Sequence, residues 1–154
     1  MMCEGETELC LFKHIKRLFP CSIDVKNAHG RGALSVVREA VSCSGYTNRY
    51  VLIDADENTL EEALFLADQH QIQVILLESC SEAVFLQILG EPVPINSKSA
   101  NLKKQLKKIV GKEPYLPLYR KAEFNKSSLI TSNELVIKKL IKLCEKHTNS
   151  NRTT

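Results

Sequence analysis

Two short, continuous apolar segments constrain the fold of this chain more than any other feature of the sequence. Residues 50–53 are a run of β-branched, aromatic and aliphatic side chains, and residues 72–77 are a second one, continuous from Val74 to Leu77. Residues 59–70 between them have the apolar spacing of an amphipathic helix. A strand without polar alternation is buried on both faces, which is typical of a parallel sheet covered by helices. These segments therefore predict a strand–helix–strand unit with a right-handed crossover.

The same alternation extends through the first 94 residues, which we assign to one domain. Residues 1–3 and 21–26 are candidate strands, and further helices are expected before Pro20, over residues 33–41 and over residues 81–89. This pattern predicts an α/β fold in which helices flank a central, mostly parallel sheet of about four strands.

A break at residues 91–94, which contains two prolines, ends the alternation, and only helices are expected after it. Residues 100–110 and 133–147 have helical apolar spacing, and Asn133 is a candidate N-cap. We predict that residues 95–147 form a basic helical extension packed on the first domain. The polar residues 148–154 are expected to be a disordered tail.

Charge is divided unevenly along the chain. Residues 1–94 contain 7 Lys and Arg against 14 Asp and Glu, a net charge of −7, whereas residues 95–154 contain 14 against 4, a net charge of +10. An acidic region followed by a basic one indicates a cation site beside a surface that binds a polyanion. Solvated helix faces would produce the same division, so charge alone does not choose between these interpretations.

The six cysteines show no zinc-binding pattern, because no two of them have Cys-x-x-Cys spacing and the histidines do not cluster with them. No apolar run approaches the roughly 20 residues that span a bilayer, and the first residues lack the features of a signal peptide. We therefore expect reduced thiols in a cytoplasmic protein without a membrane partner.

Two acidic motifs follow predicted strands. Glu4 and Gly5 come after the first strand, and Asp54 and Asp56 come at the end of the most apolar one. Residues i and i+2 of an extended chain point to the same side, so this Asp pair can direct two carboxylates to one point at the ligand-binding edge of an open α/β sheet. Two hard oxygen donors suit Mg²⁺ or Mn²⁺. Helix capping is the structural alternative for the pair taken alone.

Other polar residues near these motifs have simpler expected roles. Glu57 would point away from the Asp pair on an extended chain, so we expect it to cap the next helix. Glu6 and Glu8 are expected to be solvated acids of a first helical turn. Arg31, in the sequence Gly30-Arg31-Gly32, is either a phosphate contact or an exposed turn residue.

The order of the acidic motifs, Glu4-Gly5 and then Asp54-Ala55-Asp56, resembles the Toprim domain. The chain resembles in particular the RloB-like family of bacterial phage-resistance loci, through residues 3–8, 78–86 and, more loosely, 119–121. The resemblance extends over most of residues 1–147 and is most specific in the two acidic motifs.

The resemblance implies a metal-dependent nuclease that hydrolyses phosphodiester bonds of DNA or RNA in phage defence. It implies that Asp54 and Asp56 hold Mg²⁺ or Mn²⁺, that Glu4 is a general acid/base or a further metal ligand, and that Glu82 is an outer ligand. A carboxyl group crowded by two others is expected to have a raised pKa.

The basic region contains a second set of candidate residues. Over residues 100–110, Leu102, Leu106 and Ile109 form an apolar stripe, and lysines occupy much of the remaining surface. Clustered lysines fit contacts with a phosphate backbone that do not read bases. The predicted nucleic-acid contacts are Arg31, Lys103, Lys104, Lys107, Lys108, Arg120 and Lys121.

Two other functions stay open on the sequence alone. The chain could be a non-catalytic nucleic-acid-binding or regulatory subunit that docks on an ATPase partner. A receiver-type α/β domain also clusters acids at strand ends, but this sequence lacks a clear Lys at a later strand end. The nuclease requires Glu4, Asp54 and Asp56 to converge at one edge of the sheet.

Overall fold

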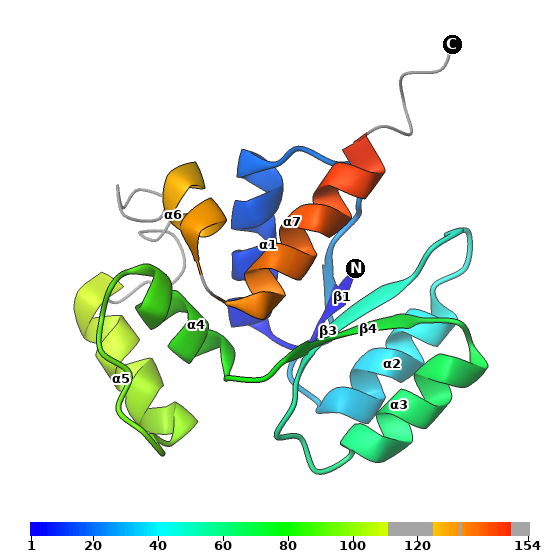
Figure 1. Ribbon diagram of the computed structural model, residues 1–154. Helices are drawn as coiled ribbons and strands as arrows, with labels where there is room; N and C mark the ends of the chain where they lie inside the picture. Colours follow the sequence, from blue (N-terminus) through cyan, green and yellow to red (C-terminus); the bar gives the residue numbers. More distant parts are fainter. Residues whose placement is uncertain (111–124, 133, 149–154) are drawn as a thin grey trace.

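The computed structural model describes residues 1–110, 125–132 and 134–148, apart from the side chain of Val110. Within these residues the chain forms seven helices and four strands, and all neighbouring strands of the single sheet are parallel. The strands, in the spatial order β2-β1-β3-β4, are β1 (Met2–Cys3), β2 (Lys26–Asn27), β3 (Tyr50–Asp54) and β4 (Gln73–Leu77) (Figure 1). The predicted α/β class, with a mostly parallel sheet of about four strands, is confirmed.

The central strand is β3. It pairs with β4 along its whole length, from Tyr50 opposite Gln73 to Asp54 opposite Leu77, and with β1 at Val51 and Leu52. Its first four residues are buried, because helices cover both faces of the sheet at this position. This burial accounts for the continuous apolar run in the sequence.

Strand β2 is shorter than the sequence indicates. A strand was expected over residues 21–26, but only Lys26 and Asn27 pair, with Met2 and Cys3 of β1. Strand β2 lies at the edge of the sheet and pairs only with β1. Because β1 has two residues, only two residues of β2 find backbone partners. Ile23, upstream of β2, is still buried in the core, which explains the apolar alternation that predicted a longer strand.

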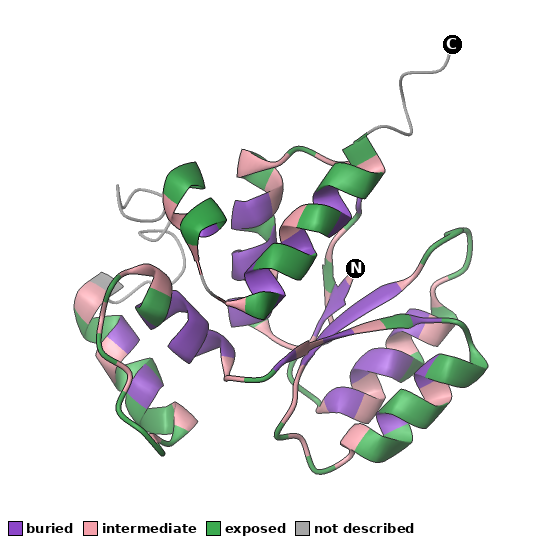
Figure 2. Cartoon of the chain, viewed as in Figure 1, coloured by how far each residue is buried: buried purple, intermediate pink, exposed green. Residues whose placement is uncertain are grey.

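Two layers of helices cover the sheet (Figure 1). Helices α2 (Ala33–Ser42) and α3 (Leu60–Gln69) lie on one face, and α1 (Glu6–Leu18) and α7 (Leu135–Thr148) lie on the other. Val51 and Ile53 of β3 belong to the apolar cluster under α2 and α3, whereas Leu52 belongs to the larger cluster under α1 and α7. Alternate side chains of one strand thus pack against the two helix layers, and Figure 2 shows that β3 is buried along most of its length.

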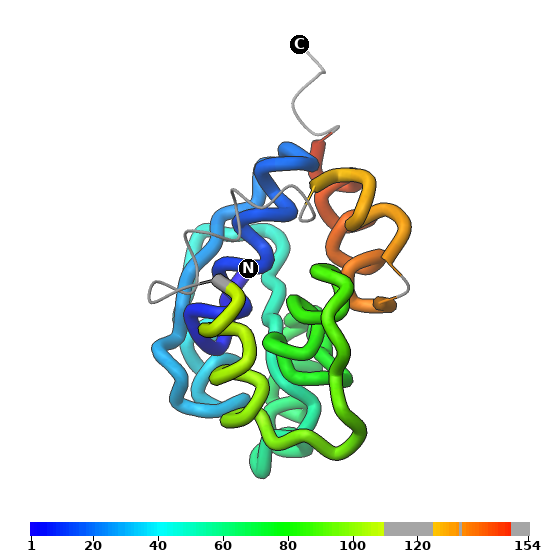
Figure 3. Tube along the Cα trace, turned by 90° about the vertical axis from the view of Figure 1, so that its left-hand side faces the viewer, coloured from blue at the N-terminus to red at the C-terminus, as the bar shows by residue number. Residues whose placement is uncertain are grey.

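The helices after residue 95 share the larger apolar cluster with the first 94 residues. Helix α5 (Ser99–Val110) packs on α4 (Ser81–Ile88) beside the sheet, and α6 (Lys126–Thr131) lies near α7 (Figure 3). Leu106 of α5, Leu129 of α6 and Leu140 of α7 all belong to the cluster that contains Phe12 of α1. The basic region therefore contributes to the same core as the sheet.

The C-terminal boundary differs from the prediction at one residue. Thr148, assigned to a tail from the sequence, is the last residue of α7, and its Oγ1 donates to the backbone oxygen of Pro20 at 2.7 Å. Residues 149–154 and the candidate N-cap Asn133 lie outside the described residues. None of the described helices is long and apolar enough to cross a membrane.

We expect the substitution Leu106→Ala to destabilise the whole fold. Leu106 is 2% exposed, so the cavity left behind should lower the free energy of unfolding by about 2–5 kcal/mol. Lys107→Ala changes the exposed neighbouring residue and should alter the free energy of unfolding by less than about 0.5 kcal/mol. Urea unfolding followed by far-UV circular dichroism measures both variants. Equal effects would mean that α5 lies outside the cooperative core.

Candidate functional site

Glu4 and Asp54 meet at the carboxyl edge of two neighbouring strands. Glu4 follows β1 and Asp54 ends β3, and the Glu4 backbone N–H donates to the Leu52 oxygen at 3.2 Å. The Asp54 backbone N–H in turn donates to Oε2 of Glu4 at 3.4 Å. Asp56 lies two residues beyond β3, is exposed, and acts on Asp54 through its charge. The structure therefore brings Glu4 and Asp54 together at one edge of the sheet, whereas Asp56 lies in the exposed turn that follows β3, so the predicted pairing of Asp54 and Asp56 on an extended chain does not form.

The pKa of Glu4 is raised to about 7. Burial is the largest cause, followed by the hydrogen bond and the negative charge of Glu57, and the Asp54 N–H opposes the shift. At neutral pH the Glu4 carboxyl is therefore populated in both its protonated and its ionised form.

The pKa of Asp54 is raised further, to about 8. Burial again contributes most, and the negative charges of Glu8, Glu4, Asp56 and Glu82 follow in that order. The buried Oδ1 of Asp54 has no hydrogen-bond partner among the described residues. A buried carboxylate oxygen without a partner is costly, so this position is suited to a proton or a cation.

Glu8 is buried rather than solvated, which corrects the expectation from the sequence. Its side chain is 6% exposed and accepts hydrogen bonds from the backbone N–H of Gly5 at 2.8 Å and from Oγ of Ser81 at 2.5 Å. Ser81 starts α4, so Glu8 joins the N-termini of α1 and α4. A Cβ atom at position 5 would lie 3.0 Å from Oε2 of Glu8. The glycine of the Glu-Gly motif therefore provides space for this carboxylate.

Glu57 also belongs to the site, contrary to the expectation that it points away. The chain leaves the strand after Asp54: the Ala55 N–H donates to the Leu77 oxygen at 2.9 Å, and a turn follows. The i, i+2 rule for extended chains therefore stops applying. The Glu57 carboxyl forms a hydrogen bond with Glu4 and raises its pKa.

The glycine-rich loop that contains Arg31 lies against Glu57. Gly32 has a φ angle of +80°, and a Cβ atom there would lie 3.1 Å from Oε2 of Glu57. The Gly30 N–H donates to the backbone oxygen of Glu4 at 2.7 Å. Arg31 itself is exposed. The loop therefore brings a solvent-accessible guanidinium to the same edge of the sheet as the acids.

Glu82 connects the acidic edge to the basic helix α5. It is 4% exposed, accepts a hydrogen bond from Oγ1 of Thr7 at 3.5 Å, and forms an ion pair with Nζ of Lys103 at 3.7 Å. Its charge also contributes to the raised pKa of Asp54. Glu82, the predicted outer metal ligand, is therefore already paired with a lysine in this structure.

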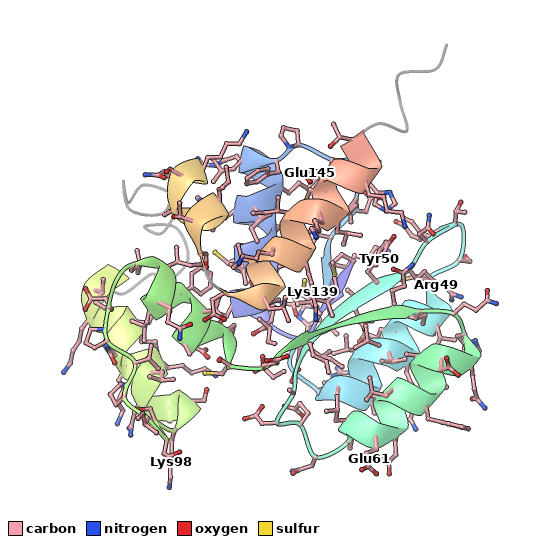
Figure 4. All side chains as sticks on the ribbon, viewed as in Figure 1. Arg49, Tyr50, Glu61, Lys98, Lys139 and Glu145 are labelled. Carbon is pink, nitrogen blue, oxygen red and sulfur yellow. The ribbon has the colours of Figure 1, made fainter. Side chains whose placement is uncertain are left out.

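The lysines of α5 lie in solvent, as predicted, while Leu102 and Leu106 are buried and Ile109 is half-buried. These exposed residues are Lys103, Lys104, Lys107 and Lys108. A second lysine surface lies on α7, and Figure 4 shows that Lys98, just before α5, and Lys139, on α7, lie on well-separated parts of the molecule. Arg120 and Lys121 lie outside the described residues.

The predicted metal ligands are Glu4, Asp54, Asp56 and, as an outer ligand, Glu82. Within residues 1–110, 125–132 and 134–148, no group of three or more His, Cys, Asp or Glu side chains is arranged to hold a metal ion. Mg²⁺ is commonly bound by only one or two carboxylates plus waters and substrate phosphate. The Glu4 carboxylate contacts the backbone of Asp54, whose own Oδ1 has no partner among the described residues, so these two acids are the candidates for such a smaller ligand set.

Comparisons with protein-family models, with curated proteins and with solved structures each found no match. They neither support nor oppose the resemblance to the Toprim domain, which stays a prediction.

In metal-free buffer, we expect Glu4 and Asp54 to make the protein less stable as pH rises. Their ordinary pKa values are 4.5 and 3.8, and the folded values are about 7 and about 8. Because the native state keeps protons that the unfolded chain releases, their contribution is fully present below about pH 4 and is lost progressively up to about pH 8.

The substitution Asp54→Asn should flatten this pH dependence, because it removes the larger of the two shifts. Urea midpoints measured with a chelator across the range test the expectation. Asp68→Asn, at an exposed position of α3, should leave the slope as in the unsubstituted protein. If Asp54→Asn has the same slope as Asp68→Asn, Asp54 does not titrate in this range.

Proposed function

We propose that this protein hydrolyses phosphodiester bonds of DNA or RNA with Mg²⁺ or Mn²⁺, as its resemblance to Toprim nucleases implies, and that it acts in phage defence. The observation that supports the proposal is the contact between Glu4 and Asp54 at the carboxyl edge of parallel strands. Both carboxyls have raised pKa values, and one Asp54 oxygen is buried without a partner among the described residues. Open α/β sheets bind ligands at this edge.

The cation would be held by Glu4, Asp54 and Asp56, with Glu82 as an outer carboxylate. When bound, it would supply positive charge that stabilises a phosphate during displacement. The same charge would relieve the repulsion among these acids, because an adjacent cation favours the ionised form of a carboxyl.

Glu4 is the residue best suited to move a proton. A general acid/base is most effective when its pKa is near the working pH, and the pKa of Glu4 is about 7. The Asp54 N–H holds Oε2 of Glu4 in place, and Glu57 contacts the same carboxyl. In the proposed reaction, Glu4 takes a proton from the attacking water or returns one to the leaving oxygen.

Positively charged side chains approach the acidic edge from two elements. Lys103 of α5 forms the ion pair with Glu82, and the exposed Arg31 lies next to Gly32, which packs against Glu57. We propose that the phosphate backbone lies along the exposed lysines of α5 and extends to the acids. Such contacts carry no base information, so the proposed binding is independent of sequence.

A non-catalytic role is the second candidate. No three ligand side chains are grouped for a metal among the described residues, and this observation favours a nucleic-acid-binding or regulatory subunit that docks on an ATPase partner. In that case the lysines of α5 would still bind nucleic acid, but the acidic edge would not support cleavage.

The double substitution Asp54→Asn with Asp56→Asn should abolish nuclease activity. Labelled DNA and RNA are incubated with the protein and Mg²⁺, Mn²⁺ or EDTA, and the products are separated on denaturing gels. We expect metal-dependent cleavage that falls at least about a hundred-fold in the double variant, the low end of what a catalytic carboxylate contributes. Far-UV circular dichroism checks that the variant is folded.

The matched control for this assay is Asp68→Asn, because Asp68 is exposed on α3 and lies away from the acidic edge. It should cleave at the rate of the unsubstituted protein. Activity retained in the double variant would rule out Asp54 and Asp56 as the site. Binding without cleavage under every metal condition would favour the non-catalytic role.

Replacing the four exposed lysines of α5 with Gln should weaken nucleic-acid binding and its dependence on salt. Each phosphate contact releases condensed counterions, so the logarithm of affinity falls with the logarithm of salt by about 0.9 per contact on duplex DNA. Fluorescence anisotropy over a salt series should show a flatter slope for the variant and a similar loss for all base sequences.

Helix α7 provides a control of equal charge. Lys138, Lys139, Lys142 and Lys146 are also exposed, and replacing these four with Gln removes the same charge from a different surface. This control should leave the salt slope almost unchanged. If the dependence of affinity on salt falls equally in the α5 and α7 variants, the binding depends on net charge rather than on the surface of α5.

A further inference from the structure

The last turn of α7 packs against the segment that connects α1 with β2. Two hydrogen bonds join them: Oγ1 of Thr148 donates to the Pro20 oxygen at 2.7 Å, and Oγ of Ser22 donates to the His147 oxygen at 3.0 Å. Pro20 and Ser22 flank Cys21. The backbone on both sides of this cysteine is therefore fixed against α7.

Cys21 and Cys144 meet at this contact. Oγ1 of Thr148 donates to the backbone oxygens of both Pro20 and Cys144, at 2.7 and 2.8 Å, and both cysteines pack in the larger apolar cluster. Cys144 is fully buried, whereas Cys21 is partly exposed. All six cysteines are free thiols. The fold therefore holds a partly exposed thiol close to a buried one.

We infer that Cys21 and Cys144 form a reversible disulfide when the protein meets a hydroperoxide. The Cys21 thiol and hydrogen peroxide give a sulfenic acid and one water. The Cys144 sulfur then attacks the Cys21 sulfur, so that an S–S bond forms, the S–O bond breaks, and the hydroxyl leaves with the Cys144 proton as a second water. One peroxide thus takes two electrons from two thiols, and a thiol reductant restores them.

The surroundings decide which thiol reacts first. Burial, and after it the hydrogen bond and charge of Cys21, raise the pKa of the Cys144 thiol. A buried thiol that stays protonated reacts poorly with a peroxide in solvent. Lys16 opposes the shift, and its Nζ donates to the nearby Ile23 oxygen. Cys21 is therefore the thiol that is oxidised first, and Cys144 resolves the sulfenic acid.

The disulfide would stabilise the fold without reaching the acidic edge. It would connect the end of α7 to the chain after α1, closing a loop that contains strands β2, β3 and β4, and cross-links over long loops restrict the unfolded chain most. Glu8 and its partner Ser81 lie at the opposite end of α1. We therefore expect a rise in Tm of roughly 5–15 °C on oxidation, with the acidic site unchanged.

Peptide mapping tests the inference directly. The full chain is treated with a small excess of hydrogen peroxide, free thiols are blocked, and the protein is digested with trypsin without reduction. Residues 18–26 contain only Cys21, and residues 143–146 contain only Cys144. We expect these two peptides joined, with a mass two hydrogen atoms below their sum, and separated again after reduction.

Three variants make the test specific. Cys21→Ser should abolish the linked peptide and the rise in Tm, and Cys144→Ala should leave Cys21 as a trappable sulfenic acid. Cys43→Ser is the matched control, because Cys43 is also partly exposed, but the partner of its Sγ is Lys26 at 3.9 Å. That variant should form the Cys21–Cys144 link at the normal rate.

Several results would overturn the inference. One is a disulfide that joins Cys21 mainly to another cysteine. Another is oxidation of Cys21 to a sulfinic acid without a disulfide to Cys144. Because Cys144 is buried, Cys144→Ala is checked by circular dichroism. Should it not fold, Cys21→Ser, at the more exposed position, provides the decisive comparison.

Discussion

The register of β1 against β3 is the constraint on which the candidate site depends. Cys3 lies opposite Leu52, and the ladder continues one step further, where the Glu4 N–H donates to the Leu52 oxygen. This register brings the Glu4 carboxylate to the backbone N–H of Asp54. A slip by one residue would turn Glu4 to the other face of the sheet and would move Cys3 out of the larger apolar cluster, in which it is fully buried, to the face under α2 and α3. The apolar core therefore positions the acids.

Asp54 carries an electrostatic conflict that its neighbour Glu8 avoids. Glu8 is buried, but two donors, the Gly5 N–H and the Ser81 hydroxyl, satisfy its carboxylate. Asp54 is crowded by four other acids and keeps one buried oxygen without a partner among the described residues. Glu8 and Asp54 lie near the same edge of the sheet, so they differ in the number of hydrogen-bond donors that the fold provides to their carboxylates. Proteins tend to leave a polar group unsatisfied where a ligand or a reaction requires it.

The sequence predicts what depends on local pattern and misses what depends on distant partners. The apolar run of β3 and the leucine–lysine spacing of α5 are periodic, and their burial agrees with the structure. The length of β2 is set by its neighbour β1, which local alternation does not reveal. The burial of Glu8 depends on Ser81, 73 residues away. Glu57 lies at the site because the chain turns after Asp54. Helix α6 is not evident from the sequence, because six residues are too few to show a helical period.

Helix α1 connects the two chemically distinct regions of the molecule. Its N-terminus carries Glu8 at the acidic edge, and the chain after its C-terminus carries Cys21 at the contact with α7. A helix of 13 residues spans about 20 Å, so the thiols do not act on the acids through their charge at physiological salt. Any influence between them must pass through packing. Because Leu11, Phe12 and Ile15 are fully buried on α1, the helix cannot shift at one end without disturbing the core under it. Cross-linking its C-terminal end to α7 would therefore restrain the position of Glu8 while leaving the hydrogen bonds of the acidic site intact.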